Sequence, residues 1–176
     1  MSAPARPPEG DARVPLGGIR EAEGAPVTVA VPEGFTLIER PKPGFMALCG
    51  PTYIRHPGDG ASPILGLRVE EKHLNMRGIV HGGLLVTLAD SALATGLHYV
   101  RKVPLSLVTV SLTTDFVETA NLGDWIEAHV DVQRVGARMA FANCYLHVGE
   151  KRILRASGVF AVVKSAAPPP QERFDG

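Results

Sequence analysis

The chain has 176 residues, 45% of them hydrophobic, which fits one globular domain with a sizeable core. Its 18 Lys and Arg balance its 18 Asp and Glu, so the charge argues against a nucleic-acid binder or a protein drawn to an anionic membrane surface. Cys49 and Cys144 stand far apart, without a CxxC pair, which offers no disulfide or zinc framework and suits a reducing compartment.

The N-terminal residues 1–34 are dominated by Ala, Pro and Gly and predict a flexible arm. The first ten residues lack the apolar core of a signal peptide, and no run in the chain approaches the length of a membrane span, so we expect a cytoplasmic protein without a membrane partner. In residues 43–49, a Pro at a plausible first helical position and a Gly just beyond predict a short helix. Residues 165–176 predict a second flexible tail, which leaves one domain over residues 35–164.

Alternating apolar and polar residues mark the strands of this domain. A run at 64–71 and a shorter one around 53–55, joined through the turn HPGDG, predict a hairpin. Helical spacing extends over about 82–100, and four alternating runs follow at 105–118, 124–135, 139–148 and 153–164. The turns between these runs are short, which implies antiparallel neighbours. We therefore predict an α+β fold in which about five or six antiparallel strands curl around one long helix.

The segment NMRGIVHGGLLVTLAD, residues 75–90, holds the densest polar chemistry in an apolar context. The first turn of a helix has unpaired N–H groups and a partial positive charge, so a carbonyl oxygen or an oxyanion can dock there. Gly82 and Gly83 let a ligand approach this backbone without a Cβ in the way. The side chains of His81 and Asn75 could add donors to the same oxygen.

Asp90 stands two turns inside the predicted helix, on a mostly apolar face. An unpaired carboxylate there is costly to bury, which suggests a partner, a cleft or a function. Eight residues separate Asp90 from Gly82, or roughly 12 Å at about 1.5 Å per residue, so one helix cannot bring both groups to one reacting carbonyl. If both act, the site needs a second, antiparallel copy of the helix. Ordinary turn chemistry at the glycines, a structural His81 and a loop-capping Asp90 are the alternatives.

The pattern Asn75-x-x-Gly78-x-x-His81-Gly82-Gly83, followed by Leu88-Ala89-Asp90, resembles the PaaI-like, or phenylacetate-degradation type, hotdog-fold thioesterases. The resemblance extends over about residues 45–164. It implies a hotdog fold, in which an antiparallel sheet wraps one long helix and two subunits join their sheets with the active sites at the interface.

The same resemblance implies roles for individual residues. Asp90 is expected to act on the thioester as general base for water or as nucleophile, and the Gly82 N–H to polarise the thioester carbonyl. Asn75 is expected to orient the carboxylate or the water, and His81 to support the carbonyl or the loop. Thr109 matches a Ser/Thr position that helps to place water, with an ordinary β-branched strand residue as the alternative.

The family thus implies an acyl-CoA thioesterase that yields a free acid and coenzyme A. We expect a homodimer, assembled into a dimer of dimers, with no cofactor and no metal, since the histidines show no metal-ligand spacing. Arg134 and Arg138 are candidates to bind coenzyme A phosphates, as are Arg152 and Arg155. The alternatives are a non-catalytic acyl-CoA-binding module and an acyl-thioester hydratase or dehydratase. The acyl group, and the choice between coenzyme A and an acyl carrier protein, are not determined by the sequence.

Overall fold

The computed structural model describes residues 30–39, 44–58, 60–101 and 106–163. Most of the predicted arm and all of the predicted tail therefore lie outside the described residues. In chain order the elements are β1 (Thr36–Leu37), α1 (Phe45–Cys49), β2 (Thr52–Arg55), β3 (Ile64–Arg68), the 3₁₀ turn η1 (Glu71–His73), α2 (Gly82–Arg101), β4 (Ser106–Phe116), β5 (Trp125–Val135), β6 (Met139–Val148) and β7 (Lys151–Val163).

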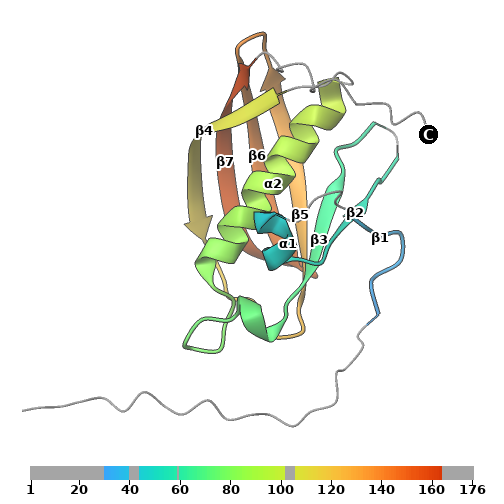
Figure 1. The fold of residues 1–176 in the computed structure, drawn as a ribbon, viewed down its shortest axis with the longest axis vertical. Helices are drawn as coiled ribbons and strands as arrows, with labels where there is room; N and C mark the ends of the chain where they lie inside the picture. Colours follow the sequence, from blue (N-terminus) through green and yellow to red (C-terminus); the bar gives the residue numbers. More distant parts are fainter. Residues whose placement is uncertain (1–29, 40–43, 59, 102–105, 164–176) are drawn as a thin grey trace, which may run out of the picture.

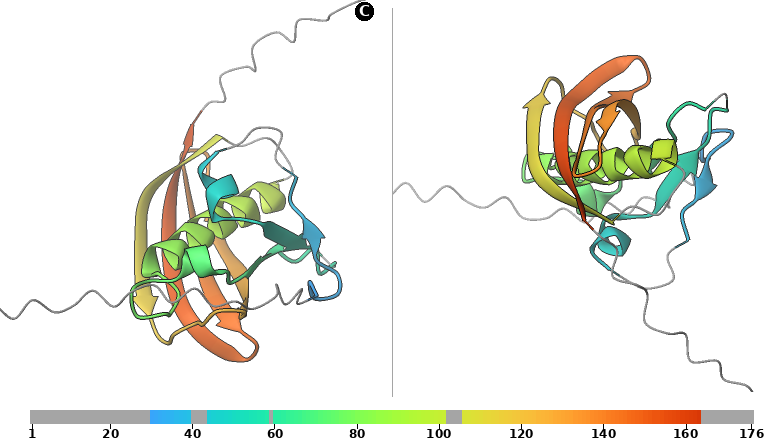
Figure 2. Two further views of the ribbon diagram at one scale, coloured as in Figure 1. Left: turned by 60° about the horizontal axis from the view of Figure 1, so that its bottom comes forward. Right: turned by 90° about the horizontal axis from the view of Figure 1, so that it is seen from above.

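The strands form one antiparallel sheet in the order β1-β2-β3-β5-β6-β7-β4 (Figure 1). The predicted hairpin is confirmed as β2 and β3, and the four later runs as β4 to β7. The seventh strand, β1, has only two residues and pairs with β2. Figure 2 shows that the sheet curves around α2, which confirms the predicted α+β fold with one long wrapped helix.

The core lies between α2 and the concave face of the sheet. Alternate residues of β5 and β6 point at the helix and are buried, as the period of a strand requires. The helix contributes a matching stripe of fully buried side chains: Leu85, Leu88, Ala89, Ala92, Leu93 and Leu97. By length and composition alone, α2 is long and apolar enough to span a membrane. The expectation that no run in the chain approaches that length was therefore wrong. The buried stripe of α2 packs on the sheet, as in the core helix of a globular domain.

Several boundaries differ from the predicted ones by one to three residues, among them those of β3 and α1. The strand predicted over 64–71 ends at Arg68, because Glu70 and His73 cap one another in a capping box that starts η1. Helix α1 begins at Phe45, with Gly44 as its N-cap, and Pro43, the predicted first helical residue, lies outside the described residues.

Strand β4 carries a bulge that changes which residues face α2. Its pairing with β7 shifts register between Thr109 and Ser111. Thr109 points at α2 before the bulge, whereas Leu112 and Phe116 do so after it. A bulge inserts one extra residue and re-aims the side chains that follow. The odd and even positions therefore exchange faces, which brings Thr109 and Leu112 to the same pocket.

Candidate active site

The N-terminus of α2 is capped by the histidine that precedes it. The Nδ1 atom of His81 accepts a hydrogen bond from the Gly83 N–H at 2.9 Å, and the His81 carbonyl accepts one from the Leu84 N–H at 3.0 Å. An accepting Nδ1 puts the proton of the neutral ring on Nε2, which is then a donor. Within the described residues the Gly82 N–H has no partner, so it is the backbone donor that remains for a ligand.

Close contacts explain both glycines. A Cβ at Gly82 would lie 3.0 Å from the Phe116 ring, and one at Gly83 would lie 3.0 Å from Nδ1 of His81. Gly83 therefore lets the His81 ring fold back over the helix start. The N–H of Gly83 is occupied by that ring, so of the two predicted glycines it is Gly82 whose N–H has no partner among the residues that the structure describes.

Asn75 shapes the loop that leads into this helix. Its Oδ1 accepts a hydrogen bond from the Arg77 N–H at 2.8 Å, and its carbonyl accepts one from the Gly78 N–H at 2.9 Å. Gly78 takes a positive φ of 74°, which glycine adopts without strain. The oxygen of the Asn75 side chain is thus committed to its own turn, and the amide nitrogen is the group left to reach a substrate or a partner.

Asp90 has the partner that its apolar surroundings require. Thr109 of β4 donates a hydrogen bond from Oγ1 to Asp90 Oδ1 at 2.9 Å. The other carboxylate oxygen has no hydrogen bond from the described residues. The two residues share a pocket of about 400 Å³. Its other lining residues are Phe45, Met46, Val86, Thr87, Ser91 and Leu112.

A second pocket lies next to the first, since Phe45 and Thr87 line both. It contains His81 and Gly83 from the start of α2, together with Leu48, Cys49, Lys72, His73 and Leu84. Helix α1 thus forms a wall of both pockets, in front of α2 in Figure 1. The predicted residues fall into two groups along one helix: the N-terminal group around Gly82 and the Asp90–Thr109 pair.

The two predicted arginines lie away from both groups. Arg134 lines a hollow with Val100, near the C-terminal end of α2, and this helix of 20 residues spans about 30 Å. Arg138 is exposed in the turn between β5 and β6. Within one chain the structure does not bring these side chains to Asp90, and their contact with coenzyme A stays a prediction.

His73 is a buried group at the site that the sequence analysis missed. Its side chain is 4% exposed. Nδ1 accepts a hydrogen bond from the Glu70 N–H at 2.9 Å, and Nε2 lies 3.0 Å from the Cys49 carbonyl. Burial, and then the neighbouring Lys72 charge, lower the pKa of His73, which favours the neutral ring. Glu70-x-x-His73 does not match the Ser/Thr-x-x-Glu/Gln pattern by which a capping box is found in a sequence, so no local signal marked this residue.

The contact of Phe116 with the site was missed as well, and so was the place of α1 at the pockets, although the short helix itself was predicted. The contact of Phe116 with Gly82 depends on the β4 bulge, and no residue pattern in the sequence predicts this bulge. Met46 of α1 accepts a hydrogen bond on Sδ from Ser91 Oγ at 3.2 Å, across 45 residues of chain. Long-range contacts of this kind carry no local sequence signal.

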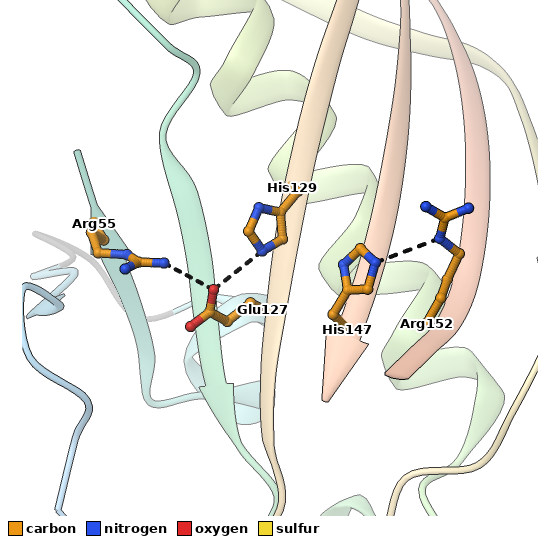
Figure 3. A network of polar contacts seen from close by, with 5 residues as sticks. All are labelled: Arg55, Glu127, His129, His147 and Arg152. Atoms are coloured by element: carbon orange, nitrogen blue, oxygen red, sulfur yellow. Dashed lines mark hydrogen bonds and ion pairs between the residues drawn. The ribbon is translucent and has the colours of Figure 1, made fainter. Parts of the chain in front are cut away.

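A second polar cluster lies on the sheet face that points away from α2 (Figure 3). Glu127 accepts from Arg55 at 3.0 Å and lies 3.1 Å from His129 Nε2, and the His129 and His147 rings meet edge to face. Burial, then the neighbouring His129 and Arg152, lower the pKa of His147. Among the described residues no His, Cys, Asp or Glu group could hold a metal ion. The cluster is separated from the pockets by the sheet.

Comparison with known proteins places this geometry in context. Residues 77–154 match the family model described as Thioesterase superfamily. A Pseudomonas aeruginosa protein named as a candidate esterase is 45% identical over 130 residues, covering 74% of this chain and 96% of its own. Mouse acyl-coenzyme A thioesterase 13 is 31% identical over 80 residues, covering 46% of this chain and 56% of its own.

A solved structure is similar in fold. The phenylacetic acid degradation protein PaaI from Thermus thermophilus, solved as a mutant, superimposes with a TM-score of 0.59 at 25% sequence identity. The match covers 68% of this chain and 98% of that one. The residues that match the family model contain α2 and strands β4 to β6.

Proposed function

This chain belongs to the thioesterase superfamily, has the hotdog fold and is a thioester hydrolase; from this premise we propose that it hydrolyses acyl-CoA at a site shared by two subunits. The choice of acyl-CoA is supported by the likeness to mouse acyl-coenzyme A thioesterase 13. No metal or cofactor takes part in the proposed reaction.

The observation that carries the proposal is the Thr109–Asp90 hydrogen bond in a largely apolar pocket. Thr109 holds one carboxylate oxygen, so the other is free to accept a proton from water. The water oxygen attacks the thioester carbon, the C–S bond breaks, and the proton passes to the departing thiolate. The products are the free acid and coenzyme A.

The second part of the proposal concerns the carbonyl oxygen of the thioester. Its developing negative charge docks on the free Gly82 N–H at the α2 N-terminus, where one donor is typically worth about 10²- to 10³-fold in rate. The Nε2–H of His81 is a second donor at the same end of α2 and can bind the same oxygen. Roughly 12 Å of helix separates Gly82 from Asp90 in one chain, so each group serves a carbonyl together with the other group from a second subunit.

Strand β4 offers the surface for that second subunit. It is the last strand of the sheet order, has 11 residues, and leaves Val108 and Val110 exposed at 54% and 59%. A long apolar edge strand is a template for pairing with another chain. Pairing of two β4 strands would continue the sheet across a two-fold axis and place the two α2 helices side by side.

One substitution tests the proposed chemistry. Asp90→Asn keeps the size of the side chain and its contact with Thr109 but removes the carboxylate, so release of free thiol from a panel of acyl-CoAs should fall about 10²- to 10⁴-fold. Thermal unfolding and the oligomeric mass should stay unchanged. Near-normal thiol release from a folded Asp90→Asn protein would remove Asp90 from this role, and the panel itself identifies the preferred acyl group.

A further inference from the structure

Helix α1 forms a wall of both pockets, yet it has little means of holding its own position. It has five residues, and none of them is buried. Phe45 and Leu48 are 66% and 75% exposed although they line the pockets. A helix this short is unstable on its own. Its place in the molecule therefore depends on contacts made by its ends.

Three polar contacts supply these anchors. Ser91 of α2 donates to Sδ of Met46, Lys72 donates to the Gly50 carbonyl, and the His73 ring meets the Cys49 carbonyl. Two of the three come from η1 and attach to the C-terminal end of α1. Of these two, Lys72 is an exposed side chain that also pairs with Glu70, whereas His73 is buried.

The hydrogen bonds of His73 leave its ring one arrangement. The Glu70 N–H can only donate, so Nδ1 of His73 is the acceptor and carries no proton. Nε2 therefore carries the proton and donates to the Cys49 carbonyl at 3.0 Å. The main chain of the same residue acts too, because its carbonyl accepts the His81 N–H at 2.8 Å. One residue thus ties α1, η1 and the N-cap of α2 together.

We propose that His73 is a positioning residue that holds α1 as the pocket wall at a set place relative to the α2 N-terminus. The inference rests on the proposed function, since it takes the pockets beside Asp90 and the α2 N-terminus as the place of the acyl group. His73 does not touch the reacting atoms in this scheme. Releasing α1 should therefore weaken binding of the acyl group and raise KM, while kcat for the bound substrate changes little.

Two substitutions separate the two ring nitrogens of His73. The oxygen of an Asn side chain reaches the place of Nδ1, so His73→Asn keeps the acceptor for Glu70 but loses the donor to Cys49. The nitrogen of a Gln side chain reaches the place of Nε2, so His73→Gln keeps that donor. If His73 were purely structural, both variants would lose stability and would show no other difference from the wild type. His147→Asn, on the opposite face of the sheet, is the matched control.

The first measurement does not depend on enzyme activity. Amide hydrogen exchange of a peptide spanning residues 44–50 should be roughly tenfold faster in His73→Asn than in the wild type, the shift expected from losing one buried hydrogen bond. His73→Gln should stay within about twofold of the wild type, as should His147→Asn. Equal exchange of α1 in all four proteins would overturn the proposal.

The second measurement uses acyl-CoA hydrolysis. KM should rise several-fold in His73→Asn, with kcat within about twofold, and His73→Gln should restore KM. A fall in kcat at constant KM would assign His73 to the chemistry and overturn a positioning role. If no variant and no wild-type protein hydrolyses acyl-CoA, the proposed function fails, while the exchange experiment still decides the role of His73.

A third measurement needs no variant and so remains valid if both substitutions prevent folding. Nitrogen NMR of the wild-type protein at neutral pH should find the His73 ring neutral, with its proton on Nε2. A charged ring, or a proton on Nδ1, is incompatible with the Glu70 contact and would overturn the proposal.

Discussion

At the scale of single residues, the start of α2 separates groups that serve the fold from groups left for a ligand. His81 Nδ1 and Asn75 Oδ1 both accept backbone hydrogen bonds within their own turns. The Gly83 N–H is used by the same cap. Three donors have no hydrogen bond within the described part of the chain: the Gly82 N–H, the Nε2 proton of His81 and the amide nitrogen of Asn75. Local capping therefore selects the donors that can meet an oxyanion.

Gly82 offers a test of the backbone donor by substitution. Proline is well tolerated at the first position of a helix and has no N–H, so Gly82→Pro removes the donor while keeping helical geometry. Gly82→Ala adds a Cβ against Phe116 but keeps the N–H, and is the matched control. We expect kcat/KM for acyl-CoA to be about 10²- to 10³-fold lower in the proline variant than in the alanine variant.

Equal activity of the proline and alanine variants would show that the Gly82 N–H plays no part. The ring of Phe116 is exposed and able to shift, so the alanine variant should fold. Circular dichroism of both variants checks that α2 is intact before their rates are compared.

Two histidines predict how stability depends on pH. The pKa values of His73 and His147 lie below their ordinary value of 6.5, so each ring binds its proton more weakly in the folded state than in the unfolded state. Their contribution to stability is therefore complete above about pH 6.5 and is lost as the pH falls from there towards the folded-state pKa values.

Urea unfolding should accordingly give a lower free energy of unfolding at pH 5 than at pH 7.5. His73→Gln should lower this pH dependence, because one of the two rings is gone. Among the described carboxylates, Glu118 is the one with a shifted pKa. This pKa is lowered from its ordinary value of 4.5, mainly because the carboxylate accepts a hydrogen bond from the Thr119 N–H. A free energy of unfolding that does not change between pH 7.5 and 5 would contradict the prediction.

At the scale of elements, glycines decide how closely α2 approaches the sheet. A Cβ at Gly96 of α2 would lie 2.7 Å from Cγ1 of Val130, and one at Gly158 of β7 would lie 2.8 Å from Cδ1 of Leu93. At these two positions a side chain of one element therefore packs directly against the glycine backbone of the other. This close approach also holds Asp90 on α2 within reach of Thr109 on β4.

Gly96→Ala should destabilise the protein although alanine is the better helix former. The helix preference favours alanine by about 1 kcal/mol, but overpacking against Val130 typically costs about 1–3 kcal/mol and forces α2 away from the sheet. Adding Val130→Ala should recover part of the loss, because the two side chains share one space. Denaturant unfolding of the two single variants and the double variant measures this coupling. Strictly additive effects would refute the contact.

At the scale of the whole molecule, one chain holds two separate groups of candidate residues and an open sheet edge. The groups around Gly82 and around Asp90 lie at two levels of α2, and β4 stands at the edge of the sheet with exposed valines. Under the proposed function both features have one cause: the second half of each site comes with the second copy of the chain.

Mixing two inactive variants tests the shared site. In a mixed dimer, the Asp90→Asn chain still supplies Gly82 and the Gly82→Pro chain still supplies Asp90. One of the two shared sites is therefore intact, and the other carries both substitutions. Random pairing makes half of the dimers mixed, so about a quarter of wild-type activity should return after co-refolding. No recovery, with mixed dimers present by mass spectrometry, would place each active site within one chain. Light scattering on the same samples distinguishes a dimer from a dimer of dimers.

Much of the fold could be predicted from the sequence because its signals are local. Period-two alternation located β4 to β7 to within about two residues at each end, and the helical stripe located α2. The candidate residues Gly82, Asp90 and Thr109 were also named from the sequence, partly through a family pattern. In the folded chain α2 and β4 bring Asp90 and Thr109 into hydrogen-bond contact.

The rest required the tertiary structure, because it depends on residues far apart in the chain. The sequence by itself determined the fold class, the long helix and the polar segment at its start, since periodicity and capping act within a few residues. Only the packed molecule decided that Thr109 bonds Asp90, that Phe116 covers Gly82, and that His73 reaches back to α1. Those contacts follow from a bulge, a close helix–sheet approach and a buried ring, whose geometry exists only after the chain has folded.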